Sequence, residues 1–249
     1  MSMAQCEAEN LGENVIIERN EDKRHFENRF ALRKIALTLL PLYNRLMFGL
    51  TVSGEDNLAD VSGGMVTICN HVHTLDCTMV AGVCRQHRMY FPTLDENLKM
   101  PFVGHLVDDL GGIPIPEKLS EFRGFMKEIE ATLRQGDAVH LFPEGSLEVY
   151  CPTLRPFQKG AFTFAYDAEV PLVPMILTYR SVNGVRSLFR KKPFLHLAIL
   201  KPVYPDVNNK RSHEIQRLLE KCRLEMQKAF EKNNPGEVLR GFAFCLNMD

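Results

Sequence analysis

The chain has 249 residues, of which 45% are apolar and 24% are charged, and its net charge is −1. This length suits one α/β domain with at most a small appendage, and the composition is that of a globular protein and excludes a disordered chain. A net charge this close to zero provides no overall field to attract nucleic acid, so we expect no nucleic-acid partner.

The N-terminal part of the chain differs from the rest. Residues 1–22 are polar and lack the basic-then-apolar order of a signal peptide, which predicts a mobile arm. Residues 23–50 predict an amphipathic helical element, basic in its first half and broken near Pro41. This pattern fits a helix in a membrane interface, and it fits equally a helix packed on the domain with a solvated basic face. The longest apolar stretch, 35–50, contains Pro41 and Arg45, so we expect monotopic contact rather than a spanning helix.

Short apolar runs alternate with helical patterns after residue 50. The runs predict strands at 65–69, 88–91, 112–115, 138–142, 172–179 and 195–200. The intervening patterns predict helices at 74–85, 101–110, 119–135, 157–168 and 213–231. This alternation predicts an α/β domain over 51–232, with a single mixed, largely parallel sheet flanked by helices, and a tail at 233–249. Ligands of such sheets bind outside the carboxyl ends of strands, so polar residues that follow strands are the candidates for function.

The first such strand end carries the segment Cys69-Asn-His-Val-His-Thr-Leu-Asp76. With His71 in a turn and Asp76 in the first helical turn, the carboxylate can accept a hydrogen bond from one ring nitrogen. The other nitrogen is then open to take a proton from a hydroxyl, which is the base-and-orienter half of a catalytic triad. Two alternatives stay open: Asp76 caps its helix beside a merely polar His71, or His71, His73 and Asp76 bind the metal of a metal-dependent hydrolase.

The second strand end carries Leu141-Phe-Pro-Glu-Gly-Ser146. Glu144 can bind substrate hydroxyls there, and Gly145 lets backbone N–H groups approach a ligand closely. The alternative is an ordinary turn between a strand and a loop.

The two segments together resemble the glycerolipid acyltransferase family, of the lysophosphatidate (1-acylglycerol-3-phosphate) acyltransferase type. The resemblance consists of N-H-x-x-x-x-D followed by F-P-E-G about seventy residues later, and it extends over about 60–200. Three further blocks agree with it in order, namely Gly-Gly-Ile-Pro-Ile at 111–115, Phe-Gln-Lys-Gly-Ala-Phe at 157–162 and Val-Pro-Leu-Val-Pro at 170–174.

The resemblance implies an O-acyltransferase domain with an N-terminal membrane element, which favours the interfacial interpretation of 23–50. It implies that His71 is the general base and that Asp76 orients it. The acceptor hydroxyl attacks the thioester of acyl-CoA or acyl carrier protein, which are co-substrates, so no metal or other cofactor is expected. The residues expected to bind substrate are Glu144, Gly145, Ser146, Lys118, Lys159 and Arg155.

Two positions depart from the family pattern. Glu117 and Leu147 stand where the family has arginines that contact the phosphate of the acceptor. An anionic headgroup then depends on Lys118, Lys159, Arg155 or Arg123. Lysophosphatidate is therefore the first expectation for the acceptor, and the alternatives are an acyltransferase for a non-phosphate acceptor and a non-catalytic lipid-binding module on the same fold.

Compartment and partners follow from the remaining features. The seven cysteines are scattered without a C-x-x-C pair, which is typical of a reducing compartment. We therefore expect a peripheral or monotopic protein on the cytoplasmic face of a membrane, in contact with membrane lipid and a lysolipid acceptor. The basic run Arg186, Arg190, Lys191 and Lys192 is either a solvated loop or a contact for anionic lipid, CoA phosphates or an acidic carrier.

Overall fold

The computed structural model describes residues 37–99, 104, 111–182 and 192–234. The chain divides into two units, 1–39 and 40–249, and all labelled elements belong to the second. The predicted arm at 1–22, most of the predicted helix at 101–110, the basic residues 186–191 and the tail from 235 onward lie outside the described residues.

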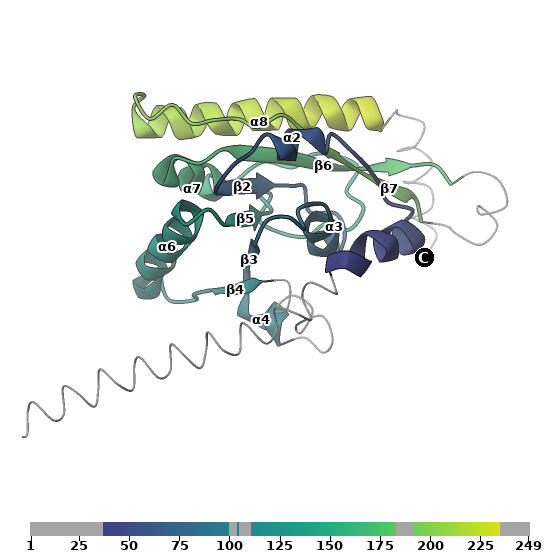
Figure 1. The fold of residues 1–249 in the computed structure, drawn as a ribbon, viewed down its shortest axis with the longest axis horizontal. Helices are drawn as coiled ribbons and strands as arrows, with labels where there is room; N and C mark the ends of the chain where they lie inside the picture. The colour runs from purple at the N-terminus through teal and green to yellow at the C-terminus, as the bar shows by residue number, and fades with distance from the viewer. Residues whose placement is uncertain (1–36, 100–103, 105–110, 183–191, 235–249) are drawn as a thin grey trace, which may run out of the picture. The chain divides into compact units, whose positions relative to one another are not determined.

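One mixed sheet organises the described part of the second unit (Figure 1). Its seven strands lie in the order β1-β7-β6-β2-β5-β3-β4. Every neighbouring pair is parallel except β6 and β7, which are antiparallel. The strands are β1 (Thr51–Ser53), β2 (Met65–Ile68), β3 (Met89–Leu94), β4 (Gly112–Ile115), β5 (Ala138–Leu141), β6 (Leu172–Arg180) and β7 (Phe194–Ile199). The expected mixed and largely parallel sheet is confirmed.

Helices flank this sheet, as the alternating pattern predicted. α6 packs against β5, α7 against β2, and α8 against β6 and α7, and Figure 1 shows α8 running alongside β6. The labelled helices are α2 (Asp56–Ala59), α3 (Asp76–Val83), α4 (Asp95–Leu98), α6 (Leu119–Arg134), α7 (Gly160–Ala168) and α8 (Arg211–Asn233). The central strands are buried on both faces, and all of β2 and eight residues of β6 are buried. Each fully buried aliphatic side chain stabilises the fold by about 1.5–3 kcal/mol, which explains the continuous apolar runs in these strands.

Some predicted elements differ in detail from the observed ones. The helix expected at 157–168 begins only at Gly160, because the N–H of Gln158 donates to the carbonyl of Pro143 at 2.7 Å. The expected break near Pro41 is wrong, since residues 37–48 are helical throughout. Leu40, Asn44 and Phe48 recur every four residues and are buried, so packing along one helix face compensates for the hydrogen bond that a proline removes.

Strand β3 continues past the predicted end at 91 and contains Pro92. The N–H of Phe91 donates to Gly111 beside β4, so the nitrogen of Pro92 faces the other side of the strand. On that side β5 pairs only with Met89 and Tyr90, so the proline costs no ladder hydrogen bond.

The register of β2 and β5 sets the position of the candidate site. These parallel neighbours pair from Met65 with Ala138 to Ile68 with Leu141, so they end at the same level. The loops that follow them therefore begin side by side at the carboxyl edge of the sheet. These loops carry the two segments that the sequence analysis selected.

Candidate active site

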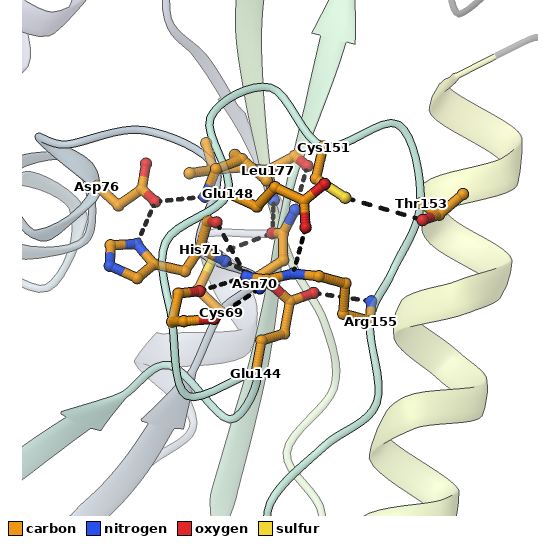
Figure 2. Close-up of polar contacts among 12 residues, drawn as sticks. Cys69, Asn70, His71, Asp76, Glu144, Glu148, Cys151, Thr153, Arg155 and Leu177 are labelled. Atoms are coloured by element: carbon orange, nitrogen blue, oxygen red, sulfur yellow. Dashed lines mark hydrogen bonds and ion pairs between the residues drawn. The ribbon is translucent and has the colours of Figure 1, made fainter.

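His71 and Asp76 meet at the end of β2 (Figure 2). Nδ1 of His71 lies 3.0 Å from Oδ2 of Asp76. An ionised carboxylate only accepts hydrogen bonds, so Nδ1 donates and Nε2 carries the lone pair in the neutral ring. The His71 side chain is 22% exposed, and Nε2 has no hydrogen-bond partner within the described residues. The pair thus has the geometry of a base whose tautomer is set by a carboxylate.

Asp76 is fully buried at the first position of α3. Its Oδ2 also accepts the backbone N–H groups of Val72 at 2.8 Å and of His73 at 3.0 Å. Burial raises the pKa of the Asp76 carboxyl, and the hydrogen bonds from His71, His73 and Val72 oppose that rise because they stabilise the charged form. Oδ2 of Asp76 is held by residues 71–73 before the helix, and Oδ1 has no hydrogen-bond partner among the described residues, so the alternative in which Asp76 serves only as a cap does not describe this structure.

The alternative interpretation was a metal ion bound by His71, His73 and Asp76. Nδ1 of His73 accepts the backbone N–H of Leu75 at 3.1 Å. Within the described ranges, no group of three or more His, Cys, Asp or Glu side chains is arranged to bind a metal ion. His71, His73 and Asp76 are therefore not arranged as one metal-binding group in the described part of the chain.

Phe142 supports the His71 ring from the second loop. The two rings stack with centroids 3.9 Å apart and an interplanar angle of 12°. The edge of His140 meets Phe142 at a centroid distance of 4.6 Å, and Nδ1 of His140 is hydrogen-bonded to Oγ1 of Thr67 at 2.8 Å. Burial, together with the nearby His71, lowers the pKa of His140 to about 3, so this ring is neutral. Sequence reasoning missed the stacking of Phe142 on His71, because this contact joins the loops that follow two different strands.

Asn70 fixes the end of β2 next to His71. Its Nδ2 donates to the carbonyl of Leu177 at 3.0 Å, and its Oδ1 accepts the N–H of the same residue at 2.7 Å. The side chain is fully buried and so extends the pairing of β2 with β6 beyond the end of the strand. The asparagine of the N-H segment was a signal that could have suggested this role.

Glu144 and Arg155 form an ion pair behind the backbone of His71. Nη2 of Arg155 lies 2.7 Å from Oε2 of Glu144, and the backbone N–H of Arg155 donates to Oε1 at 3.0 Å. The N–H of His71 also donates to Oε2 of Glu144, at 3.1 Å. In Figure 2 the His71 ring points toward Asp76, whereas Glu144 and Arg155 lie on the other side of the His71 backbone. The Glu144 residue is only 7% exposed.

The other residues predicted to bind substrate divide into two sets. Gly145 has a φ of 78° and closes a turn with its N–H on Phe142 at 3.0 Å, while the hydroxyl of Ser146 accepts from Nη1 of Arg155 at 2.9 Å. Both belong to the loop beside His71. Lys118 and Lys159 are exposed residues that precede α6 and α7. The structure thus brings the first set together with Glu144 and Arg155, and it places the two lysines on separate elements.

Glu117 and Leu147, the two positions that depart from the family pattern, have charged neighbours in the sequence. Glu117 and Leu147 are exposed, and Nζ of Lys118 lies 3.6 Å from Oε1 of Glu121. The guanidinium of Arg155 is shared with Glu144 and lies 3.7 Å from Oε2 of Glu148. Carboxylates therefore accompany both Lys118 and Arg155.

A mixed, largely parallel sheet with a histidine–aspartate pair at the end of a central strand defines the class of protein. The chain matches the family model described as Acyltransferase over residues 49–178, which is more than half of its 249 residues. The chain belongs to this acyltransferase family.

Individual relatives agree with the family. The chain is 29% identical over 194 residues to the 1-acyl-sn-glycerol-3-phosphate acyltransferase of Saccharomyces cerevisiae, covering 73% of this chain and 60% of that protein. It is 24% identical over 180 residues to the protein of the same name from Helicobacter pylori, covering 70% of this chain and 73% of that protein. The aligned part spans only 43% of a chloroplastic relative from Brassica napus, to which it is 25% identical.

A solved structure shares the fold. The 1-acyl-sn-glycerophosphate acyltransferase PlsC from Thermotoga maritima superposes with a TM-score of 0.53 at 20% identity, and the match covers 80% of this chain and 83% of that one. The similarity extends over most of the described sheet and its helices.

Proposed function

We propose that this chain is an O-acyltransferase that moves a fatty acyl group from a thioester to the hydroxyl of a lysophospholipid, in phospholipid biosynthesis. The observation that carries the proposal is the 3.0 Å contact between Nδ1 of His71 and Oδ2 of Asp76, with Nε2 left open. The relatives named for 1-acyl-sn-glycerol-3-phosphate acylation support this acceptor as the first candidate.

The reaction needs only the groups that the site provides. Nε2 of His71 takes the proton of the acceptor hydroxyl as its oxygen attacks the thioester carbonyl. The C–O bond forms, the tetrahedral intermediate collapses, and the C–S bond breaks. The imidazolium then gives its proton to the departing thiolate, which leaves as free thiol. The buried Asp76 carboxylate stabilises the imidazolium and keeps the ring oriented through both proton transfers.

The loop after β5 and the exposed lysines are the residues that bind the headgroup of the acceptor in this proposal. We assign Gly145, Ser146, Lys118 and Lys159 to acceptor binding, with Gly145 providing a close approach for the ligand. Exposed Leu147 and Glu117 favour a second candidate, an acceptor without a phosphate monoester, because neither side chain can neutralise a phosphate.

Membrane contact is assigned to residues 40–48. Leu42, Tyr43, Leu46 and Met47 are 57%, 41%, 71% and 50% exposed, and Arg45 is also exposed. A helix with this outward face buries its apolar side chains in a lipid interface while its cation stays at the headgroups. No helix of the described ranges is long and apolar enough to span a bilayer. We place the protein on the cytoplasmic face as a monotopic enzyme.

The test is a panel of acceptors incubated with the purified chain and vesicles. Oleoyl-CoA and an oleoyl carrier protein serve as alternative donors, and mass spectrometry identifies the acylated product. The acceptors are 1-acylglycerol-3-phosphate, lysophosphatidylcholine, lysophosphatidylethanolamine and monoacylglycerol. We expect phosphatidate to form fastest. Product from the other acceptors alone supports the second candidate, whereas vesicle binding without any acylated product identifies a non-catalytic lipid-binding module.

A further inference from the structure

The peptide groups on both sides of His71 are bound by the loop that follows β5. The N–H of His71 donates to Oε2 of Glu144 at 3.1 Å. Its carbonyl accepts the N–H of Glu148 at 3.1 Å and Nη2 of Arg155 at 3.4 Å. The next carbonyl, that of Val72, accepts the N–H of Tyr150 at 2.9 Å. These hydrogen bonds hold the turn that carries His71 against the loop that follows β5.

Protein donors already occupy the carboxylate of Glu144. Oε1 accepts the N–H of Arg155, and Oε2 accepts the N–H of His71 and Nη2 of Arg155. The side chain of Glu144 is 1% exposed. A substrate hydroxyl would have to displace one of these charge-assisted hydrogen bonds, which are stronger than bonds between neutral groups.

The guanidinium of Arg155 is engaged in the same way. Nη1 donates to the hydroxyl of Ser146, and Nη2 contacts the carbonyls of Ser146 and His71 as well as Glu144. The Arg155 side chain is 18% exposed, and its Nε is buried without a hydrogen-bond partner among the described residues. Two of the acceptors of Nη2 are thus backbone carbonyls, those of His71 and Ser146, and Figure 2 shows Arg155 beside Glu144.

We propose that the Glu144–Arg155 pair positions His71 and does not bind the acceptor. The inference rests on the proposed function. It assigns the placement of the base to an ion pair whose two residues were expected from the sequence to bind substrate. A fixed main chain at residue 71 determines where Nε2 lies, and a displacement of about 1 Å at a reacting group costs on the order of 100-fold in rate.

Steady-state kinetics distinguishes positioning from binding. We expect Glu144→Gln and Arg155→Lys each to lower kcat by about 10- to 100-fold, with KM for both the acceptor and oleoyl-CoA changed less than about two-fold. The double variant is expected to be little worse than either single one, because the two residues act as a unit. Asp167→Asn and Arg211→Lys alter a more exposed ion pair, with 2.6 Å between Nη2 and Oδ2, and serve as matched controls that leave kcat unchanged.

A second readout does not depend on activity. Hydrogen–deuterium exchange of the peptide that contains His71 is expected to accelerate at least about ten-fold in Glu144→Ala, because its N–H loses the acceptor. Thermal unfolding shows which variants are folded, and Arg155→Lys preserves the charge if Glu144→Ala is unstable. A raised acceptor KM with unchanged kcat, or unaltered exchange at His71, overturns the positioning role. A wild-type chain that forms no acylated lipid overturns the proposed function instead, and the exchange result still decides the positioning role.

Discussion

The imidazole of His71 is placed by three residues from two separate segments. Asp76 binds Nδ1 from the start of α3, Phe142 stacks on the ring from the loop after β5, and Glu144 accepts the backbone N–H. A general base must present one nitrogen at the acceptor hydroxyl, and orientation contributes as much to this as the identity of the ring. Catalysis by His71 therefore depends on the placement of its ring as well as on the chemistry of the ring.

His140 provides a pH-dependent stability test. Its pKa is about 3 in the folded protein and near 6.5 when unfolded, so below pH 6.5 the unfolded state binds a proton that the folded state does not. Stability therefore falls as the pH falls from 6.5 toward 3, by up to ~1.4 kcal/mol per pH unit. We expect the loss between pH 7 and pH 5, measured by urea unfolding, to be about 2 kcal/mol smaller in His140→Gln.

The control for this measurement is His213→Gln, because His213 is exposed on α8. The expected result is a wild-type pH dependence in that variant. An identical loss of stability in wild type and His140→Gln would contradict the buried, neutral state of this ring.

Sequence alone was informative about the base and its partner, and less so about their surroundings. His71 and Asp76 belong to one turn and the helix that follows it, so their spacing predicts that they can approach. Their contact was found at 3.0 Å. The contacts of Glu144 and Phe142 depend on the register of β2 with β5, which no local pattern encodes. The substrate roles of Gly145, Ser146, Lys118 and Lys159 stay predictions.

At the level of elements, the central strands were predictable and the short edge elements were not. β2, β5 and β6 are mostly apolar runs because nearly all of their residues are buried. β1 has three residues, and α2 and α4 have four residues each, which is too short for a periodic pattern. The start of α7 was misplaced because the bond from Gln158 to Pro143 keeps the preceding residues non-helical.

The beginning of α8 depends on Glu214. Its side chain is buried and accepts from the guanidinium of Arg217, from the N–H of Asp206 at 2.9 Å and from Nδ2 of Asn209 at 2.9 Å. The hydrogen bonds from Arg217 lower the pKa of Glu214 to about 2, against the opposing effect of burial. We expect Glu214→Gln to reduce the free energy of unfolding at pH 7 by about 1–3 kcal/mol.

The pH dependence of this effect has a definite sign. A carboxylate with a depressed folded pKa stabilises the fold above its unfolded value near 4.5 and loses this contribution as the pH falls toward 2. The difference between Glu214→Gln and wild type should therefore narrow over that range. Glu220→Gln, on an exposed position of the same helix, serves as the reference. An equal difference at pH 7 and pH 2.5 would show that the charge of Glu214 is not the cause.

For the molecule as a whole, the exposed apolar face of residues 40–48 predicts how it associates with lipid. Replacing Leu42 and Leu46 by Glu removes apolar surface and adds repulsion from anionic headgroups. We expect the double variant to lose at least about 10-fold in affinity for vesicles containing phosphatidylserine, measured by flotation. Leu224→Glu is the matched control, since Leu224 is 54% exposed on α8. Equal binding by the double variant and wild type would exclude this face as the membrane contact.

The chemistry of the whole chain depends on the open nitrogen of His71. The most direct test is the rate of phosphatidate formation from 1-acylglycerol-3-phosphate and oleoyl-CoA, followed by mass spectrometry in wild type, His71→Ala and His213→Ala. We expect a loss of at least about 1,000-fold for His71→Ala with unchanged thermal unfolding, and no loss for His213→Ala. A folded His71→Ala protein that forms phosphatidate within about ten-fold of the wild-type rate would contradict this expectation.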